Sequence, residues 1–313
     1  MTGTLITHAL ILAAGLGTRL RPLSDVRAKP AMPVGGEPLI RHIIRWLSAR
    51  GVSDLIINLH HRPETLTGIL GDGSDLGARV RYSWEQPLVL GSAGGPRKAL
   101  PLIDADPFFV VNGDTLAEVD LKAMTAAHQK SAALVTLALV PNRAYDLYGG
   151  VRVNDAGWVT GFSRKGPESQ GTWHFVGVQV VSQSVFASLA DDQPANTIGQ
   201  VYDALIRQRP DAVQAFRSDV AFRDIGTPAD YLETSVALST GGVAIGARAV
   251  IDPSATIRES ILWDDVEVGA GTSLTRCIVA DGVRVPAGVE YTSKILMLRD
   301  GALAVSAIGP THG

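Results

Sequence analysis

The first 240 residues alternate between short apolar runs and longer amphipathic stretches. The apolar runs are rich in Val, Ile and Leu, as is typical of buried strands, and they are Ala9–Ala13, Leu55–Leu59, Phe108–Val111 and Leu134–Val140. The amphipathic stretches have apolar residues at helical spacing, and they are Pro38–Ala49, Asp120–Lys130 and Pro228–Leu238. This alternation predicts an α/β sheet with helices on both faces. Ligands bind beyond the carboxyl ends of the strands in such sheets, so the residues that follow each strand are the first candidates for a site.

The pattern changes after about Thr240, where helical spacing stops. A branched aliphatic residue then recurs about every six residues, from Ile251 to Val285. A six-residue period is typical of a β-solenoid, and we predict a short one of about two turns, with irregular strands as the alternative. The sequence therefore predicts a catalytic domain over residues 1–240 and a solenoid-like tail with a C-terminal extension over 241–313.

Composition narrows the class of protein. The chain has 313 residues and is 46% hydrophobic, which is enough for a large core. Its 28 Lys and Arg against 31 Asp and Glu give no overall basic field for nucleic acid or an anionic membrane, so any phosphate site must be local. Cys277 is the only cysteine, which excludes an internal disulfide and fits a small buried apolar residue. With no signal peptide or membrane span in the pattern, we expect a cytoplasmic protein.

A glycine loop follows the first predicted strand, with the sequence Gly15-Leu16-Gly17-Thr18-Arg19, and Lys29-Pro30 comes shortly after it. Such a loop lets backbone amides approach phosphate oxygens, and nearby Arg and Lys side chains can neutralise them. A dinucleotide-binding fingerprint would need glycine in place of Leu20, and a Walker loop would need Gly-Lys-Ser or Gly-Lys-Thr. The loop therefore predicts a phosphate site of another kind, with a generic glycine turn as the alternative.

The same string, Gly15-x-Gly17-Thr18-Arg19 followed after nine residues by Lys29-Pro30, resembles the signature of the sugar-1-phosphate nucleotidyltransferase family. The resemblance implies a Rossmann-like mixed sheet sandwiched by helices, and a short C-terminal left-handed β-helix-like segment. It also implies that the loop wraps the nucleotide phosphates, with Arg19 and Lys29 in contact with them. The loop residues concerned are Ala13, Ala14, Gly15, Gly17 and Thr18. Glu37 departs from the family, which usually has lysine there.

Later segments match the family in the expected order. Trp84–Gly94 resembles the segment that reads the nucleobase, which implies that role for Gln86 and Gly91; a surface turn before a helix is the alternative. Tyr148-Gly149-Gly150-Val151 and Phe175–Val178 resemble segments whose backbone packs against the sugar, which implies sugar contacts at Gly150 and Gly177.

A lysine near residue 165 extends the sugar side of the resemblance. The family commonly has Glu-Lys-Pro where this chain has Arg164-Lys165-Gly166. Lys165 is therefore expected to bind the sugar phosphate, whereas Arg164 replaces the glutamate that binds sugar hydroxyls. A solvated Arg-Lys turn is the alternative.

Two aspartates follow apolar strands. Asp114 comes directly after Phe108-Phe109-Val110-Val111-Asn112-Gly113, and Asp224 lies in Phe222-Arg223-Asp224-Ile225-Gly226. Mg²⁺ is bound by one or two protein carboxylates together with substrate phosphates. The alternative is that each aspartate only stabilises a turn or caps a helix. Both positions match the family's metal-binding aspartates, so the resemblance implies that they hold Mg²⁺, with Asn112 beside them in the binding site.

The expected reaction is attack of a sugar 1-phosphate oxygen on the α-phosphorus of a nucleoside triphosphate, with pyrophosphate leaving. The nucleophile is already an anion, so the protein's task is to align two polyanions and neutralise them. The tail and the segment Leu90-Gly91-Ser92-Ala93-Gly94 resemble those of mannose-1-phosphate guanylyltransferases, which implies GTP and mannose 1-phosphate as substrates. The tail is expected to make subunit contacts in a homo-oligomer or to cap the catalytic domain. The alternatives are a uridylyltransferase for a hexose or amino-sugar 1-phosphate, and a non-catalytic regulatory subunit, which Glu37 and Arg164 keep open.

Overall fold

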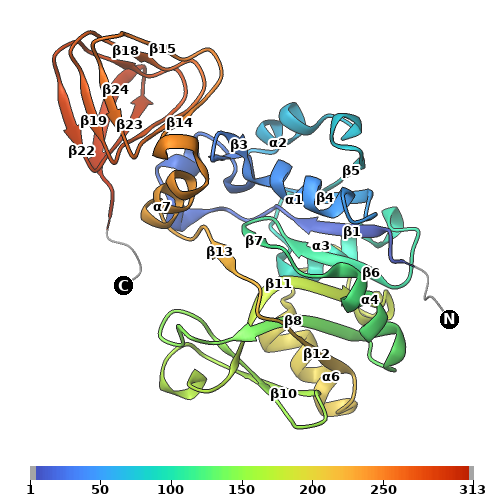
Figure 1. Cartoon of the computed structure of the whole chain (residues 1–313). Helices are drawn as coiled ribbons and strands as arrows, with labels where there is room; N and C mark the ends of the chain where they lie inside the picture. Colours follow the sequence, from blue (N-terminus) through green and yellow to red (C-terminus); the bar gives the residue numbers. More distant parts are fainter. Residues whose placement is uncertain (1–4, 310–313) are drawn as a thin grey trace. The chain divides into compact units, whose positions relative to one another are not determined.

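The computed structural model describes residues 5–309, and Figure 1 shows the course of the chain. The chain divides into two compact units. Unit 1 contains the residues up to Gly15 together with Ile43–Pro63 and Leu70–Arg223, whereas unit 2 contains Leu16–His42, Glu64–Ile69 and the residues from Asp224 on. The ends of the two predicted regions, residues 1–4 and 310–313, lie outside the described residues. Over residues 5–309, no helix combines the length and the apolar character that a membrane span requires.

Unit 1 is built on a nine-stranded mixed sheet whose main path runs β10-β9-β11-β6-β1-β4-β5, with β8 beside β11 and β12 beside β8. Its strands are β1 His8–Leu12, β4 Asp54–Leu59, β5 Arg79–Trp84, β6 Phe108–Asn112, β8 Val135–Pro141, β9 Gly150–Val153, β10 Val159–Ser163, β11 Trp173–Val181 and β12 Val213–Arg217. Strands β6, β1, β4 and β5 are parallel, and β11 runs antiparallel to both β6 and β8. The predicted mixed sheet is confirmed.

Helices cover both faces of this sheet, which explains why its central strands are apolar without a break. Leu10 and Val110 belong to a core cluster that includes residues of α3 Gly91–Ala99, α5 Ser184–Ala187 and α6 Tyr202–Gln208. On the other face, His128 of α4 Leu121–Lys130 is hydrogen-bonded to Thr136 at 2.8 Å. Because side chains alternate between the faces of a strand, burial on both faces requires an apolar residue at nearly every position.

The other strands and helices of the first 240 residues are short or have residues in both units. Helix α1 Leu39–Ser48 begins in unit 2 and ends in unit 1, whereas α2 Pro63–Leu70 belongs to unit 2 except for its first and last residues. Strand β7 Thr115–Ala117 pairs with β13 Phe222–Asp224 in a separate two-stranded sheet. All the strands and helices predicted from periodicity are present, with ends that differ by no more than one residue.

Unit 2 begins with the signature loop. Three 3-10 turns, Thr18–Leu20, Leu23–Asp25 and Lys29–Ala31, lead into the hairpin of β2 Pro33–Val34 and β3 Glu37–Pro38. Helix α7 Pro228–Leu238 begins at a capping box in which the side chains of Thr227 and Asp230 bond each other's backbone N–H groups.

A solenoid of parallel strands completes unit 2. Its strands are β14 Ala244–Ile245, β15 Val250–Ile251, β16 Thr256–Arg258, β17 Ile261–Leu262, β18 Glu267–Val268, β19 Ser273–Thr275, β20 Ile278–Val279, β21 Arg284–Val285 and β22 Glu290–Thr292, followed by β23 Lys294–Arg299 and β24 Ala302–Ala307. They stack as β14-β17-β20-β23-β24, β15-β18-β21 and β16-β19-β22, so three full coils are present. The expectation of about two turns is therefore wrong.

The reason for the undercount is the length of one coil. Equivalent positions, such as Ile261 and Ile278, are 17 residues apart, so two sides of each coil have six residues and the third has five. A strict six-residue period therefore loses register once per coil. The inward side chains of the second and third coils form a buried core with Cys277, which confirms that Cys277 is a small buried apolar residue.

Candidate functional site

The carboxyl ends of the parallel strands of unit 1 bring several predicted site residues together. Leu12, at the end of β1, is paired with Asn112, at the end of β6. Just beyond them, the Gly113 N–H donates to the Leu12 carbonyl at 2.9 Å. Ala13 and Ala14 follow β1 and are buried. Asn112 and the start of the signature loop therefore share one edge of the sheet, where ligands bind in α/β folds.

A buried polar network fixes this edge, and sequence reasoning missed it. The Ala13 N–H donates to Asn58 Oδ1 at 2.6 Å, and Asn58 Nδ2 donates to Glu85 Oε1 at 2.7 Å. The Leu90 N–H donates to the other carboxylate oxygen of Glu85 at 2.6 Å. The network thus connects the end of β1 to the loop that precedes α3, which contains the predicted base-reading residue Gln86.

The electrostatics of Glu85 follow from this position. Burial raises the pKa of the Glu85 carboxyl, and the hydrogen bonds from Leu90 and Asn58 offset the effect only in part. Two signals could have indicated the network: Asn58 is a polar residue near the end of a buried strand, and Glu85 directly precedes Gln86.

Gly91 starts α3 in a conformation that favours glycine, with φ 76°. A Cβ there would lie 2.7 Å from the Ala195 carbonyl oxygen and 2.9 Å from Asn196 Oδ1. Ala93 donates its N–H to the same carbonyl at 2.9 Å, so the 195–196 segment lies against the first turn of the helix. The local packing alone therefore requires glycine at this position, and base reading by Gly91 stays a prediction.

Gly177 lies directly beside Asn112. It has φ 78° at an irregularity in β11, where the register with β8 shifts between Phe175 and Gln179. A Cβ at Gly177 would lie 2.8 Å from the Asn112 Cβ, closer than carbon atoms approach without a shift. The strand predicted to contact the sugar thus adjoins the edge predicted to hold the nucleotide.

The segment that contains Lys165 folds over Gly150. The hydroxyl oxygens of Ser163 and Ser169 are 2.9 Å apart, and Ser169 also donates to the Arg164 carbonyl at 2.5 Å. A Cβ at Gly150 would lie 2.6 Å from Ser163 Oγ, so the cluster requires glycine there. The side chains of Arg164 and Lys165 are exposed.

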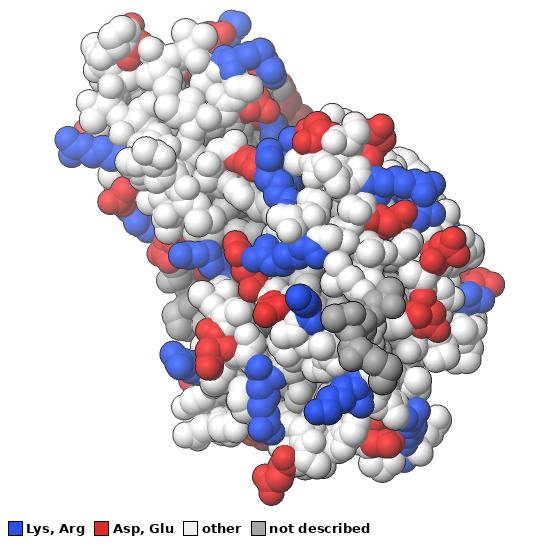
Figure 2. All heavy atoms as spheres, turned by 45° about the vertical axis from the view of Figure 1, so that its right-hand side comes forward, with Lys and Arg blue, Asp and Glu red and all other residues white. Residues whose placement is uncertain are grey.

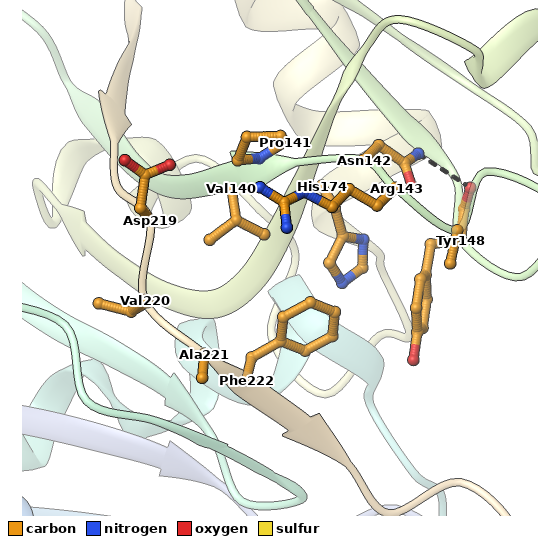
Figure 3. A pocket seen from close by; sticks show the side chains of 11 residues that line it. Val140, Pro141, Asn142, Arg143, Tyr148, His174, Asp219, Val220, Ala221 and Phe222 are labelled. Atoms are coloured by element: carbon orange, nitrogen blue, oxygen red, sulfur yellow. Dashed lines mark hydrogen bonds between the residues drawn. The ribbon is translucent and has the colours of Figure 1, made fainter.

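A cavity of about 350 Å³ opens where β8 ends and β11 begins (Figure 3). Tyr148, His174 and Phe222 form its aromatic wall, with ring centroids 4.2 Å apart for Tyr148 and His174 and 4.8 Å apart for His174 and Phe222. Arg143 and Asp219 contribute the charged groups. Burial lowers the pKa of His174 to about 4, so the imidazole is neutral at pH 7.

This aromatic cavity lies close along β11 to Gly177, the predicted sugar contact. His174 precedes Gly177 by three residues on β11, which corresponds to roughly 10 Å along a strand. None of the cavity's aromatic side chains was predicted as a site residue. Tyr148 and Phe222 both stand beside motifs that the sequence singled out, and that proximity was the available signal.

In unit 2, the structure brings Arg19, Lys29 and Asp224 together. Lys29 Nζ lies 3.9 Å from Asp224 Oδ1, and a Cβ at Gly226 would lie 3.0 Å from Arg19 Nη1. Gly17 has φ 61°, and a Cβ there would lie 3.1 Å from Ser24 Cβ, so the loop turns tightly beside Thr18. Two cations and a carboxylate that are far apart in the sequence thus form one local group.

The aspartates predicted to bind metal belong to different units, Asp114 to unit 1 and Asp224 to unit 2. Asp114 Oδ1 accepts from Thr115 Oγ1 at 3.2 Å. Across residues 5–309, no three His, Cys, Asp or Glu side chains gather into a metal-binding group. Carboxylate oxygens are hard donors, and Mg²⁺ needs only one or two of them beside substrate phosphates, so these side chains fit Mg²⁺ better than a metal with a full protein cage.

Charges of both signs are interspersed on the face shown in Figure 2. No broad basic surface is visible on that face, in keeping with the net charge of −3. This face is in keeping with the expectation that any phosphate site is local, and phosphate binding by Arg19 and Lys29 stays a prediction.

Comparisons with known proteins identify the family of this chain. The family model described as nucleotidyl transferase matches residues 8–241, and the model described as GlmU-like, C-terminal hexapeptide matches residues 236–292. Mannose-1-phosphate guanylyltransferase of Mycobacterium tuberculosis is 29% identical over 90% of this chain and 81% of its own length. N-acetylmuramate alpha-1-phosphate uridylyltransferase of Neisseria meningitidis is 43% identical over 40% of this chain and 53% of its own length.

Among solved structures, HddC from Yersinia pseudotuberculosis complexed with GMP-PN has the same fold. Its TM-score is 0.63 at 24% identity, over 74% of this chain and 98% of that chain. The family model covers the whole of the sheet and its helices, and the named relatives transfer nucleotides to sugar 1-phosphates. The chain therefore belongs to the sugar-1-phosphate nucleotidyltransferase family and is an enzyme of that class.

Proposed function

We propose that this enzyme transfers GMP from GTP to mannose 1-phosphate and releases pyrophosphate. The location of the site is supported by one observation. Ala13, Asn112 and Gly177 lie together at the carboxyl edge of the parallel strands, and the hydrogen bonds of Glu85 connect the Gln86 loop to the same edge. The choice of substrates is supported by the Mycobacterium guanylyltransferase, which is similar over both the catalytic region and the tail.

The chain's own cations neutralise the two polyanions in this proposal. Arg19 and Lys29 bind the triphosphate and the leaving pyrophosphate, and Lys165 binds the attacking phosphate. Gln86 and Gly91 read the base, while Gly150 and Gly177 contact the sugar through their backbone. The attacking oxygen is already ionised, so catalysis rests on alignment and charge neutralisation.

Asp114 and Asp224 would hold Mg²⁺, a role carried over from the family resemblance. When bound, the ion supplies positive charge to the phosphate oxygens. Chelation by EDTA should therefore stop pyrophosphate release, and added Mg²⁺ should restore it.

A uridylyltransferase for a hexose or amino-sugar 1-phosphate is the second candidate. The Neisseria enzyme, a uridylyltransferase, has the higher identity of the two relatives, although over a shorter stretch. A panel of GTP, UTP, ATP and dTTP against mannose, glucose, N-acetylglucosamine and N-acetylmuramate 1-phosphates, read by pyrophosphate release, separates the two. We expect the highest kcat/KM for GTP with mannose 1-phosphate; a preference for UTP would replace our proposal with the second candidate.

A regulatory subunit is a further alternative, which the departures at Glu37 and Arg164 leave open. It predicts binding of a sugar nucleotide, measured by calorimetry, with no turnover on any member of the panel.

Asp114→Asn tests the metal assignment. We expect a loss of about 10³-fold or more in pyrophosphate release, because the amide lacks the negative charge that attracts Mg²⁺, with an unchanged melting temperature. Asp155→Asn, at an exposed turn, is the matched control and should stay active. Near-normal release by Asp114→Asn would refute the metal role.

A further inference from the structure

Arg27 connects the signature loop to the solenoid within unit 2. It lies two residues before Lys29, and its side chain is only 13% exposed. Its Nε donates to Asp281 Oδ2 at 2.7 Å, and its Nη2 donates to both Asp281 Oδ1 and Asp264 Oδ2 at 2.6 Å. The guanidinium is thus shared by two carboxylates of the tail.

The two carboxylates occupy equivalent positions of successive coils. Asp264 and Asp281 are 17 residues apart, one coil length, and the Asp264 N–H donates to Asp281 Oδ1 at 3.1 Å. Stacked carboxylates repel each other, and Arg27 supplies the charge that neutralises them. Burial by itself would lower the pKa of Arg27, but the hydrogen bonds and charges of Asp281 and Asp264 raise it on balance, so the guanidinium stays ionised.

A second contact fixes the other end of the same segment. Trp263 is fully buried beneath Arg27, whose guanidinium carbon lies 5.3 Å from the ring centroid. Trp263 Nε1 donates to the Tyr231 hydroxyl at 2.9 Å, and that hydroxyl donates to the Pro33 carbonyl at 2.6 Å. Figure 1 shows α7, which contains Tyr231, beside the first coils of the solenoid.

The solenoid therefore holds the chain at Arg27 and at Pro33, and Lys29 lies between these two points. Lys29 is itself buried and starts a 3-10 turn, so its backbone position decides where its ammonium group lies. We infer that the tail is a positioning element of the active site, and that Arg27, through Asp264 and Asp281, sets the place of Lys29. This inference rests on the proposed role of Lys29 at the nucleotide phosphates.

Arg27 is a positioning residue, so its loss should affect nucleotide use more than fold stability or sugar phosphate binding. For Arg27→Met we expect kcat/KM for the nucleoside triphosphate to fall roughly 10- to 100-fold, because small misplacements of a binding group are costly. The KM for the sugar 1-phosphate should change less than twofold, and Arg27→Lys should recover part of the loss. The amides of Ala31 and Met32, which are hydrogen-bonded in the turn that begins at Lys29, should exchange hydrogen faster than in the wild type.

Arg248 provides a matched control. It also forms a two-bond pair with an aspartate one coil away, Asp265, at 2.6 Å for each bond. Its side chain is 68% exposed, and its ion-pair partner Asp265 lies within the solenoid. Arg248→Met should therefore leave nucleotide kinetics and hydrogen exchange at Ala31 and Met32 unchanged. Normal nucleotide kinetics and normal exchange in Arg27→Met would overturn the inference.

Arg27→Met leaves two carboxylates facing each other and could lose stability for that reason alone. The triple variant Arg27→Met, Asp264→Asn, Asp281→Asn removes the repulsion. We expect it to regain the melting temperature but not the nucleotide kcat/KM; recovery of both would show that Arg27 acts only on stability. If the wild type turns over no substrate, the proposed function fails, and the hydrogen exchange comparison still decides whether the tail fixes the loop.

Discussion

Glu85 shows how a single buried carboxylate organises the edge of the sheet. Each of its side-chain oxygens accepts a hydrogen bond, one from Asn58 and one from Leu90. Gly95 packs closely against this network, since a Cβ at Gly95 would lie 2.8 Å from Asn58 Nδ2, the atom that donates to Glu85. The hydrogen bond that Glu85 accepts from Leu90 fixes the loop that contains Gln86.

Glu85→Gln is expected to weaken this loop. A glutamine side chain has one acceptor oxygen, so one of the two donors loses its partner, at a cost of about 1–3 kcal/mol in unfolding free energy. The KM for the nucleotide should rise because the Gln86 segment is no longer fixed. Urea unfolding and steady-state kinetics measure the two effects, and an unchanged variant in both would show that the network has no role in positioning.

His174 predicts a dependence of stability on pH. Its pKa is about 4 in the folded protein, owing first to burial, against about 6.5 when unfolded. Between these pH values the unfolded chain binds more protons at this residue than the folded protein does. The free energy of unfolding therefore falls as the pH drops from about 6.5 to about 4, by up to about 3 kcal/mol. Above pH 6.5 this residue has no effect on it.

The variant His174→Phe isolates that contribution. Its unfolding free energy should fall less than that of the wild type across the same pH range. His128, whose pKa burial also lowers, is present in both proteins and cancels in the difference. Parallel curves for the two proteins would contradict the assignment.

At the scale of elements, the irregularity of β11 brings two predicted binding segments together. Gly177→Ala must place a side chain at positive φ and against Asn112, so we expect a loss of about 1–3 kcal/mol in unfolding free energy together with reduced turnover. Gly171→Ala is the control, because Gly171 also has φ 73° but no atom within 4 Å of its would-be Cβ. Equal losses in the two variants would mean that contact with Asn112 is unimportant.

The solenoid is the element whose length the sequence misjudged. Its period is 17 and not 18, and opposite charges stack at that spacing, as in Glu259 with Arg276 and Glu267 with Arg284. These pairs are exposed, so each contributes little to stability. They show, however, that charged residues as well as apolar residues follow the 17-residue repeat.

At the scale of the whole molecule, subunit assembly through the tail stays a prediction. Strand β24 forms one edge of its sheet, where Val305 is 41% exposed, and Leu298 on the adjacent strand β23 is 42% exposed. An edge strand with exposed apolar residues can pair with a second copy. Val305→Lys should then lower the molar mass measured by light scattering. A wild type that is monomeric at all concentrations would refute the prediction. A point substitution tests assembly better than deletion of the residues beyond Gly241, because that deletion would also remove Asp264 and Asp281, the partners of Arg27.

The sequence by itself determined the α/β class, the order of its main strands and helices, and the family, because these depend on local periodicity and on a short glycine and lysine signature. It also predicted Asn112 and Gly177 as residues of one site, and the structure places them side by side. The boundary near residue 240 and the roles of the site residues stay predictions.

Only the tertiary structure decided which distant residues support that site. Asn58 and Glu85 are 27 residues apart, and Arg27 lies 237 and 254 residues from Asp264 and Asp281. No local pattern specifies such pairs, since each residue alone is compatible with an exposed turn. The number of coils was likewise decided by stacking between chain segments, because a five-residue side in each coil hides the repeat from any fixed period.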